Sequence, residues 1–376
     1  MYLGVDVSTY LEEIEKNAHY YDGKKEVNPL ELLRSNGVDY MRIRLWVNPY
    51  DESGASYKAG NCDLNNFLKL SKLALNLGYN ILLDFHYSDF WADPGKQFIP
   101  KDWVNLSKEE LIKKVYDYTF ETLNVIKASG IEISMIQIGN EITNGILWPI
   151  GKIDRINHIY NYETLASLLK AGLKASSVVF PNALRMLHLE KSYDHEVYDE
   201  FFSNMEKYNV EYEIIGASYY PYWHGTFKEL FDNLKKCEKK YKKKIVIAEV
   251  SYAFTLDDYE EGENSLVINP KVIEECNKNK MGVNYPFTQD GQKEFIKDFL
   301  KECLNNNIYG VFYWEPLWIP GDDICFASNG AMKYIHEDKQ ILRNEWSNQC
   351  LFDYEGKKTK GFDEFKMIKI VNGERN

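Results

Sequence analysis

Long hydrophobic runs are absent from this sequence. No stretch approaches the 18 or more uninterrupted apolar residues of a membrane-spanning helix, although 44% of the 376 residues are hydrophobic. This excludes a transmembrane span and leaves enough apolar side chains for a large core. A signal-peptide pattern is absent too, because strand-like residues follow Met1 almost at once. We therefore expect a cytoplasmic protein, unless the chain is a trimmed form of a secreted one.

Positive charge is also scarce. Lys and Arg number 45 against 57 Asp and Glu, which gives a formal net charge of −12 at pH 7. Nucleic-acid binding needs clustered basic residues that contact phosphates. The one basic run, at residues 235–244, ends a predicted helix and is interpreted as a solvated face. We expect a monomer whose partner is neither nucleic acid nor a membrane.

The sequence motifs of several enzyme classes are missing. The six cysteines show no CxxC spacing, so neither a zinc site nor a disulfide framework is indicated. There is no HxH or HExxH motif, no GxSxG elbow and no glycine-rich phosphate loop. Asp84, His86 and His188 would be the remaining metal ligands, but His86 serves equally well as a hydrogen-bond donor to a sugar. We predict catalysis without a metal.

Aromatic residues, in contrast, are abundant. They make up 15% of the chain, with 28 Tyr and 8 Trp. Tyr and Trp combine an apolar face with a polar edge, which suits surfaces that hold neutral, hydroxylated ligands. A large ordinary core would have the same composition, so composition alone leaves both interpretations open.

Short apolar runs alternate with amphipathic helical stretches, as in a parallel sheet whose strands are connected by helices. Several runs are apolar almost throughout, which is typical of strands covered on both faces. We predict strands at residues 3–7, 40–46, 80–87, 134–141, 184–190, 214–220, 244–251 and 309–315. Eight such units predict an α/β fold, a (β/α)8 TIM barrel, with one catalytic domain over residues 1–376.

Helix signals and long loops add detail to this barrel. Asn28 is expected to cap the first long helix, and Ser107 with Glu110 to form a capping box. Two connections are long for barrel loops, residues 89–105 after the third strand and 253–286 after the seventh. Both follow the carboxyl end of a strand, where barrel active sites are built.

Two glutamates are the sharpest catalytic candidates. Glu141 and Glu249 end the apolar runs of the fourth and seventh predicted strands. A carboxylate at such a place needs a partner or a task, and glycoside cleavage needs two carboxyl groups that face each other across a sugar. The residues alone leave a second interpretation open, in which each glutamate pairs with Arg42 or Arg44 in a buried ion network.

Several runs of residues carry a likeness to a known family. They lie at residues 4–8, 40–46, 60–64, 84–97, 137–142, 147–149, 218–225, 312–316 and 348–354. Together they resemble glycoside hydrolase family 53, the arabinogalactan endo-β-1,4-galactanases, over nearly the whole chain. The fourteen-residue run 84–97 is the most specific, whereas Asn140-Glu141 is shared by a whole clan of retaining barrels.

The resemblance implies endo-cleavage of the β-1,4-galactan side chains of pectin, with retention at the anomeric carbon and no required cofactor. It makes Glu141 the general acid/base and Glu249 the nucleophile. Asn140 would bond the sugar 2-hydroxyl, and Arg44 would pair with Glu249 and hold it ionised.

The resemblance also assigns the walls of the site. The cleavage subsite is expected to be lined by His86, Tyr219 and Trp314. The groove for neighbouring galactosyl units is expected to include Trp91, Asp93, Trp148, Trp223 and Trp318, with plain packing as the alternative for each. Asp84 and His188 complete the predicted substrate-binding set.

The loop after the seventh strand departs from the family pattern. In bacterial members this loop resembles a calcium site with Asp, Asp, His and Asn at alternate positions, completed by an Asp near a C-terminal Asn-Gln. Here the matching positions hold Asp258, Glu260, Gly262 and Asn264, and Ser347 precedes the Asn-Gln pair. Two ligands are missing, so we expect no structural calcium in this loop.

Two other functions remain as alternatives. One is a related retaining barrel that acts on another β-linked glycan, such as mannan or xylan, because the substrate is inferred from resemblance. The other is a sugar-binding barrel that has lost catalysis. The presence of Glu141 and Glu249 together with Asn140 and Arg44 argues against that second alternative.

Overall fold

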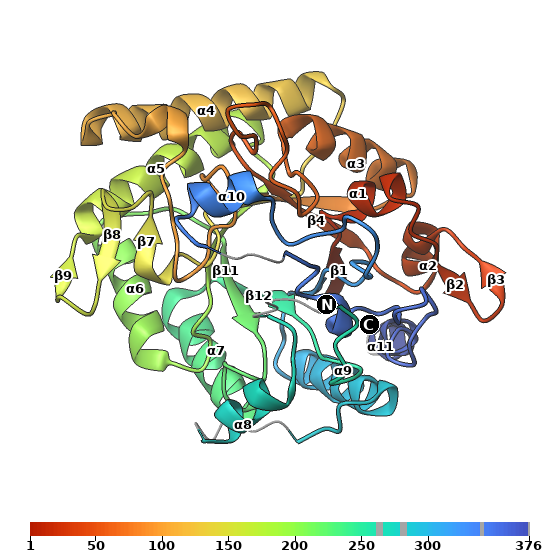
Figure 1. The fold of residues 1–376 in the computed structure, drawn as a ribbon. Helices are drawn as coiled ribbons and strands as arrows, with labels where there is room; N and C mark the ends of the chain where they lie inside the picture. Colours follow the sequence, from red (N-terminus) through yellow and green to blue (C-terminus); the bar gives the residue numbers. More distant parts are fainter. Residues whose placement is uncertain (261–265, 279–283, 339–341, 375–376) are drawn as a thin grey trace.

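The computed structural model of the protein describes residues 1–260, 266–278, 284–338 and 342–374. At its centre is a closed barrel of eight parallel strands, in which the last strand returns to pair with the first (Figure 1). The strands are β1 (Tyr2–Asp6), β4 (Tyr40–Leu45), β5 (Asn80–Phe85), β6 (Met135–Ile138), β10 (Leu184–Leu189), β11 (Ile214–Tyr219), β12 (Lys244–Val250) and β13 (Gly310–Trp314). All eight predicted strands are present, and the (β/α)8 prediction is confirmed.

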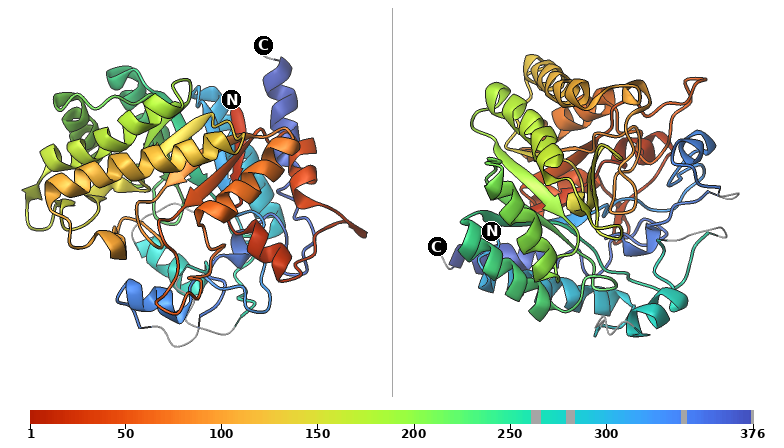
Figure 2. Two further views of the ribbon diagram at one scale, coloured as in Figure 1. Left: turned by 90° about the horizontal axis from the view of Figure 1, so that it is seen from above. Right: turned by 90° about the vertical axis from the view of Figure 1, so that its left-hand side faces the viewer.

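Helices form the outer layer, and two further views show them outside the strands (Figure 2). They are α2 (Pro29–Ser35), α3 (Leu64–Asn76), α4 (Lys108–Ala128), α5 (Tyr162–Val179), α6 (His195–Lys207), α7 (Phe227–Tyr241), α9 (Gln289–Asn305) and α11 (Glu364–Glu374). The predicted caps are confirmed: Asn28 accepts backbone hydrogen bonds at the start of α2, and Ser107 forms a capping box with Glu110 on α4. None of the helices described combines the length and apolar character needed to cross a membrane.

Shorter elements that we did not predict fill the connections. They are α1 (Tyr10–Glu15), the hairpin β2 (Tyr21–Asp22) and β3 (Lys25–Glu26), η1 (Lys101–Trp103), η2 (Ile142–Asn144), the small sheet β7 (Gly145–Ile146), β8 (Gly151–Asp154) and β9 (Ile159–Tyr160), α8 (Pro270–Lys278), α10 (Asn329–Tyr334) and η3 (Ser347–Gln349). Of these, η1 lies in the long loop after β5 and α8 in the long loop after β12.

The barrel interior is layered, because strand side chains alternate between the interior and the helix layer. An apolar layer at the floor consists of Tyr40, Leu82, Met135, Met186, Ile214, Val246, Ala248 and Phe312. Gly4 faces this layer, where a Cβ atom would lie 2.3 Å from the ring of Phe312. Two residues further along four of these strands comes a buried polar layer of Arg42, Asp84, Gln137 and His188, and Ser218 of β11, four residues after Ile214, belongs to the same layer. The fold therefore places a polar layer directly beneath the carboxyl ends of the strands.

Candidate active site

Glu141 and Glu249 meet at the carboxyl end of the barrel. Both line a cavity of about 360 Å³, and both side chains are buried. One carboxylate oxygen of Glu141, one of Glu249 and a ring nitrogen of His188 all lie within 4.8 Å of one another. Seven further predicted site residues line the same cavity: Arg44, His86, Trp91, Asp93, Asn140, Trp223 and Trp314. The structure thus brings most of the predicted site together.

Glu249 reaches the barrel interior through an irregularity in β12. Ala217 of β11 pairs with Ile247, but Ser218 pairs with Glu249, so Ala248 is an extra residue between them. A bulge of this kind shifts the alternation and re-aims the side chains that follow it. The carboxylate of Glu249 therefore points into the cavity instead of towards the helix layer.

The carboxylate of Glu249 is held by two donors. Arg42 Nη1 donates to Oε1 at 2.9 Å, and the Tyr220 hydroxyl donates to Oε2 at 2.8 Å. Burial raises the pKa of Glu249, while the charge of Arg42 and the hydrogen bond from Tyr220 act in the opposite direction. These two contacts favour the ionised form.

Glu141 has different surroundings. It follows β6 in a left-handed backbone conformation, with φ of 48°. The Ser218 hydroxyl donates to its Oε1 at 2.6 Å, and within the described residues no Lys or Arg forms an ion pair with it. Burial and the nearby charges of Glu249 and Glu190 hold the pKa of Glu141 well above its usual range. The pKa is thus raised for both carboxyl groups, but Glu249 has a cation and a hydroxyl donor that oppose the rise, whereas Glu141 has the Ser218 hydroxyl alone.

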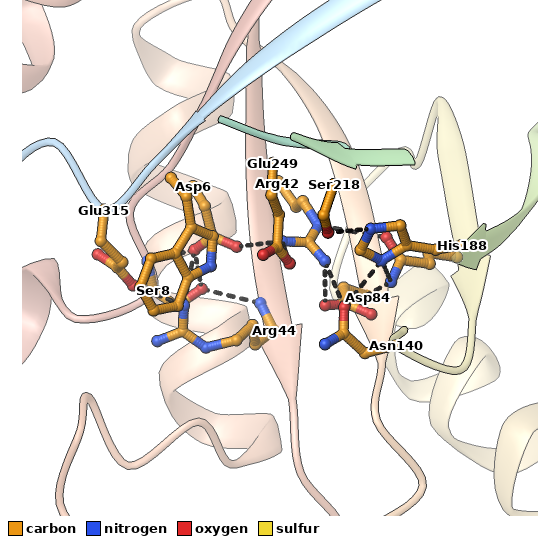
Figure 3. A network of polar contacts seen from close by, with 12 residues as sticks. Asp6, Ser8, Arg42, Arg44, Asp84, Asn140, His188, Ser218, Glu249 and Glu315 are labelled. Carbon is orange, nitrogen blue, oxygen red and sulfur yellow. Dashed lines mark hydrogen bonds and ion pairs between the residues drawn. The ribbon is translucent and has the colours of Figure 1, made fainter. Parts of the chain in front are cut away.

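Arg42 occupies the centre of the polar layer (Figure 3). Besides Glu249, its guanidinium contacts Asp6 at 3.0 Å, Asp84 at 2.8 Å and Asn140 at 2.8 Å. The ion pair that the alternative interpretation expected is thus present for Glu249, with Arg42 as its partner. The same alternative does not describe Glu141.

The predicted pairing of Arg44 with Glu249 is wrong. Arg44 Nη1 instead contacts Asp6 at 3.0 Å and Glu315 at 2.6 Å. Its guanidinium carbon lies 4.4 Å from the ring centre of Trp91, in a cation–π contact. Both arginines extend from β4 into the barrel interior, but Arg42 lies one layer deeper, level with Glu249. Sequence alone does not report that depth.

The predicted role of Tyr219 is also wrong, and its neighbour Tyr220 takes it. Tyr219 points into the helix layer, where its ring stacks on Phe299 with centroids 5.3 Å apart. Its hydroxyl donates to the carbonyl of Gly225. Alternation along β11 explains the exchange, because Ser218 and Tyr220 share the interior face and Tyr219 does not.

Four other predicted substrate-binding residues do not line this cavity. Asp84 and His188 are fully buried in the polar layer, where Asp84 pairs with Arg42 and His86. Trp318 is fully buried against Trp91 and Trp314. Trp148 lines a separate cavity of about 640 Å³ with Phe98 and Tyr334. For Trp318, therefore, the structure shows the packing role that was the alternative to a place in the groove.

Several cavity residues were not predicted. Tyr220, His224 and Glu190 follow the ends of β11 and β10, and Phe326 and Trp346 come from the segment after β13. Strand alternation would have identified Tyr220 and Glu190. Burial raises the pKa of Glu190 to about 7. No periodic pattern marks Phe326 or Trp346. The ring of Trp346 lies edge-on to that of Trp314, with centroids 4.4 Å apart.

Glu141, Glu249 and His188 are close enough to share a metal ion, but their contacts do not suit one. One nitrogen of His188 faces Ser218 and the other faces Asn140 and Gln137. The guanidinium of Arg42 already neutralises Glu249. These groups are better described as members of a hydrogen-bond network than as a ligand set.

The expected calcium-free loop is described only in part. Gly262 and Asn264 lie outside the described residues. Of the remaining positions, Glu260 accepts a hydrogen bond from the backbone N–H of Asn344 at 2.9 Å. That contact occupies one of the oxygens that calcium would need.

Comparison with known proteins gives a consistent result. The model of glycosyl hydrolase family 53 matches residues 2–365. The endo-beta-1,4-galactanase of Bacillus subtilis (strain 168) is 33% identical over 374 residues, covering 94% of this chain and 82% of the relative. Arabinogalactan endo-beta-1,4-galactanase A of Aspergillus niger is 31% identical over 342 residues, 88% of each chain.

Solved structures agree with these sequence relationships. The GH53 catalytic domain of Ignisphaera aggregans superimposes with a TM-score of 0.86 at 35% identity, covering 97% of this chain and 95% of that one. Xylanase 10B from Thermotoga maritima gives a TM-score of 0.58 at 13% identity, a likeness of fold alone.

Proposed function

The chain belongs to glycosyl hydrolase family 53 and is a glycoside hydrolase, and we propose that it cleaves β-1,4-galactan within the chain with retention of anomeric configuration. The observation that carries this proposal is the asymmetry of the two carboxyl groups. Arg42 and Tyr220 stabilise a negative charge on Glu249, whereas Glu141 has no cation beside it in the described residues. One group is prepared to attack and the other to donate a proton.

In the first step, Glu249 attacks the anomeric carbon and Glu141 protonates the departing glycosidic oxygen. The carbon–oxygen bond between the sugars breaks as a covalent bond to Glu249 forms. The separation of the two carboxyl groups supports this step, because their nearest oxygens lie within 4.8 Å. Retaining enzymes hold their carboxyl groups about 5–5.5 Å apart, whereas inverting enzymes need about 6.5–9.5 Å to admit a water.

In the second step, Glu141 acts as a base. It removes a proton from water, which attacks the anomeric carbon and releases Glu249 as a carboxylate. Arg42 and Tyr220 already occupy hydrogen-bonding positions on that carboxylate, so its charge is stabilised as the bond breaks. The two inversions together give net retention.

The walls of the cavity suit a hydroxylated ring. Trp91, Trp223, Trp314 and Trp346 offer aromatic surface against which the apolar face of a sugar can stack. Asn140 Nδ2 donates to the carbonyl of Ala92 and has a second hydrogen, which we assign to the sugar 2-hydroxyl. We propose that no cofactor or metal takes part, because the two carboxyl groups supply the complete acid–base and nucleophilic chemistry.

The choice of galactan rests on the relatives, whose names identify them as β-1,4-galactanases. Mannan and xylan are therefore the competing substrates in the test. The protein is incubated with each of the three polysaccharides while new reducing ends are measured. Release from galactan alone is expected, and equal release from mannan or xylan would contradict the substrate assignment.

The two carboxyl groups are tested with Glu141→Ala and Glu249→Ala. Each is expected to reduce galactan hydrolysis by several orders of magnitude. Glu132→Ala is the matched control, because Glu132 is exposed just before β6, at the opposite end of the strand that precedes Glu141. Proton NMR of the first product then reports the stereochemistry: β-configured ends support retention, and α-configured ends contradict it.

A further inference from the structure

A chain of short hydrogen bonds runs from Glu141 into the polar layer. The Ser218 hydroxyl lies 2.6 Å from Glu141 Oε1, and His188 Nε2 lies 2.9 Å from the Ser218 oxygen. At its other end, His188 Nδ1 is 3.0 Å from Asn140 Oδ1 and 3.1 Å from Gln137 Nε2. Figure 3 shows His188 between Ser218 and Asn140. All of these side chains are buried, so protein contacts determine their hydrogen-bond directions.

We propose that Ser218, oriented by His188, is a positioning residue that keeps Oε1 of Glu141 as a permanent hydrogen-bond acceptor and so places the transferable proton on Oε2. This inference rests on the proposed role of Glu141 as acid and base. A serine hydroxyl has a single proton, which it directs either to Glu141 or to His188. The direction depends on which nitrogen of His188 carries hydrogen.

His188 is neutral and therefore has one N–H group. Burial and the nearby charge of Arg42 hold the pKa of His188 well below its usual range. If Nε2 carries the hydrogen, it donates to Ser218, and the Ser218 hydroxyl is left to donate to Glu141. If Nδ1 carries it, Ser218 must donate to His188, and Oε1 of Glu141 must hold the acid proton itself.

Arg42 orients the two amides that decide between these tautomers. It donates from Nε to Gln137 Oε1 at 3.2 Å and from Nη2 to Asn140 Oδ1 at 2.8 Å. The Gln137 amide nitrogen must therefore face His188 as a donor. Its other contacts are the carbonyl of Gly139 at 3.0 Å and Asn140 Oδ1 at 3.1 Å.

Counting donors and acceptors selects the Nε2–H tautomer. With hydrogen on Nε2, Gln137 donates to Gly139 and to the free Nδ1 of His188, and Asn140 Oδ1 keeps its donor from Arg42. With hydrogen on Nδ1, Asn140 Oδ1 would have to accept hydrogen bonds from Arg42, Gln137 and His188, although it has only two lone pairs. The first arrangement satisfies every group, so the Ser218 proton points to Glu141.

This direction has a consequence for the reaction. Ser218 donates to Oε1 whether Glu141 is a carboxylate or an acid, so the proton leaves from and returns to Oε2. The same hydrogen bond favours the charged form of Glu141 and lowers its pKa, against burial and the acidic groups Glu249, Glu190 and Asp93 that raise it. Loss of the Ser218 hydroxyl should therefore weaken proton delivery and also raise the pH at which Glu141 loses its proton.

Ser218→Ala tests the proposal with two substrates that differ in leaving group. For galactotetraose, whose departing sugar needs protonation, we expect kcat/KM to fall about 10- to 100-fold, the effect of losing a hydrogen bond to a charged group. For 2,4-dinitrophenyl β-galactotrioside, whose leaving group needs no acid, kcat/KM should change little. The alkaline limb of the galactotetraose profile should move to higher pH.

Conservative variants separate positioning from folding. Ser218→Thr keeps the hydroxyl, and His188→Gln keeps an N–H donor near the position of Nε2. Each of these variants should therefore retain most of the wild-type kcat/KM on galactotetraose, unlike Ser218→Ala. His188→Leu should resemble Ser218→Ala. Ser71→Ala is the matched control, since Ser71 is a buried serine on α3 whose hydroxyl has no hydrogen-bond partner among the described residues.

Two results would overturn the inference. One is an equal loss on both substrates with an unmoved alkaline limb, which would mean that Ser218 supports the fold only. The other is full activity of Ser218→Ala on galactotetraose. Glu141→Ala measured in parallel tests the underlying function separately. If that variant shows no dependence on leaving group and no rescue of kcat by azide, the acid/base assignment itself fails.

Discussion

Arg42 donates to Oε1 of Glu249 at 2.9 Å, although 207 positions separate the two residues in the sequence. The guanidinium is fully buried, and it also contacts Asp6, Asp84 and Asn140. A cation in this position lowers the free energy of the ionised nucleophile, and its remaining N–H groups donate hydrogen bonds to the surrounding polar layer. Arg42 therefore links the charge state of Glu249 to the geometry of the acid/base side.

Arg42→Lys should move the acid limb of the kcat/KM profile to higher pH. The charge of Arg42 lowers the pKa of Glu249. A lysine cannot reproduce the planar set of donors, so the pKa rises and the ionised nucleophile is lost at a higher pH as the solution is acidified. We expect kcat/KM to fall about 100-fold at the optimum, measured as reducing ends from galactan.

Arg44→Lys is the control for that experiment. Arg44 contacts Asp6 and Glu315 but not Glu249, so its replacement should leave the acid limb in place. A shift of the limb in Arg44→Lys, with none in Arg42→Lys, would restore the pairing that we first predicted from the sequence.

Tyr220→Phe should lower the catalytic rate, whereas Tyr219→Phe should lower only the stability of the fold. Tyr220→Phe removes a hydrogen bond to the Glu249 carboxylate, and we expect kcat to fall about 10- to 100-fold. Tyr219→Phe removes only a contact with the Gly225 carbonyl, so kcat should remain and the free energy of unfolding should fall by about 1 kcal/mol. Steady-state kinetics and urea unfolding of both variants distinguish them. Loss of kcat in the Tyr219 variant would show that this side chain reaches the substrate.

The barrel was predictable because its pattern is repeated along the chain. Eight apolar runs, separated by helices with cap signals such as Ser107 and Glu110, indicate the order of elements without any knowledge of contacts between distant residues. Glu141 and Glu249 stood out as carboxylates at the ends of two apolar strands, and the family resemblance then predicted their roles. What remained hidden was the depth of side chains in the barrel, because Arg42 and Arg44 share one face of β4 and differ only in height.

Alternation alone succeeds on one strand and fails on another. On β11 it would have placed Ser218 and Tyr220 together inside the barrel. On β12 it places Ala248 inside correctly but would have placed Glu249 outside, since no sequence signal marks the irregularity that precedes Glu249. Trp346 comes from a segment after β13 without any period, and its position depends on packing against Trp314. These differences come from tertiary contacts that local pattern does not report.

Removal of divalent cations should leave the protein unchanged. Glu260 accepts from the backbone of Asn344, and the Tyr354 hydroxyl donates to the carbonyl of Asp257, so protein groups already take oxygens near the candidate calcium position. After dialysis against EDTA we expect the same Tm and the same galactan hydrolysis. Stoichiometric calcium binding by calorimetry, with a rise in Tm, would contradict this expectation.

Glu13→Gln should stabilise the protein at neutral and alkaline pH. Glu13 is fully buried on α1, and burial together with the charges of Glu12 and Glu315 holds its pKa well above the usual range. The folded state therefore keeps this proton, whereas the unfolded chain releases it above a pH of about 4.3. Stability is lost progressively as the pH rises from that value towards the raised pKa of the folded state, by about 1.4 kcal/mol for each pKa unit.

The amide of the variant has no proton to release, so in urea unfolding the advantage of Glu13→Gln should be small near pH 5 and grow towards pH 8. Glu15→Gln, an exposed change on the same helix, is the control and should show no such growth. An advantage of Glu13→Gln that is constant across this range would mean that Glu13 is ionised in the folded protein.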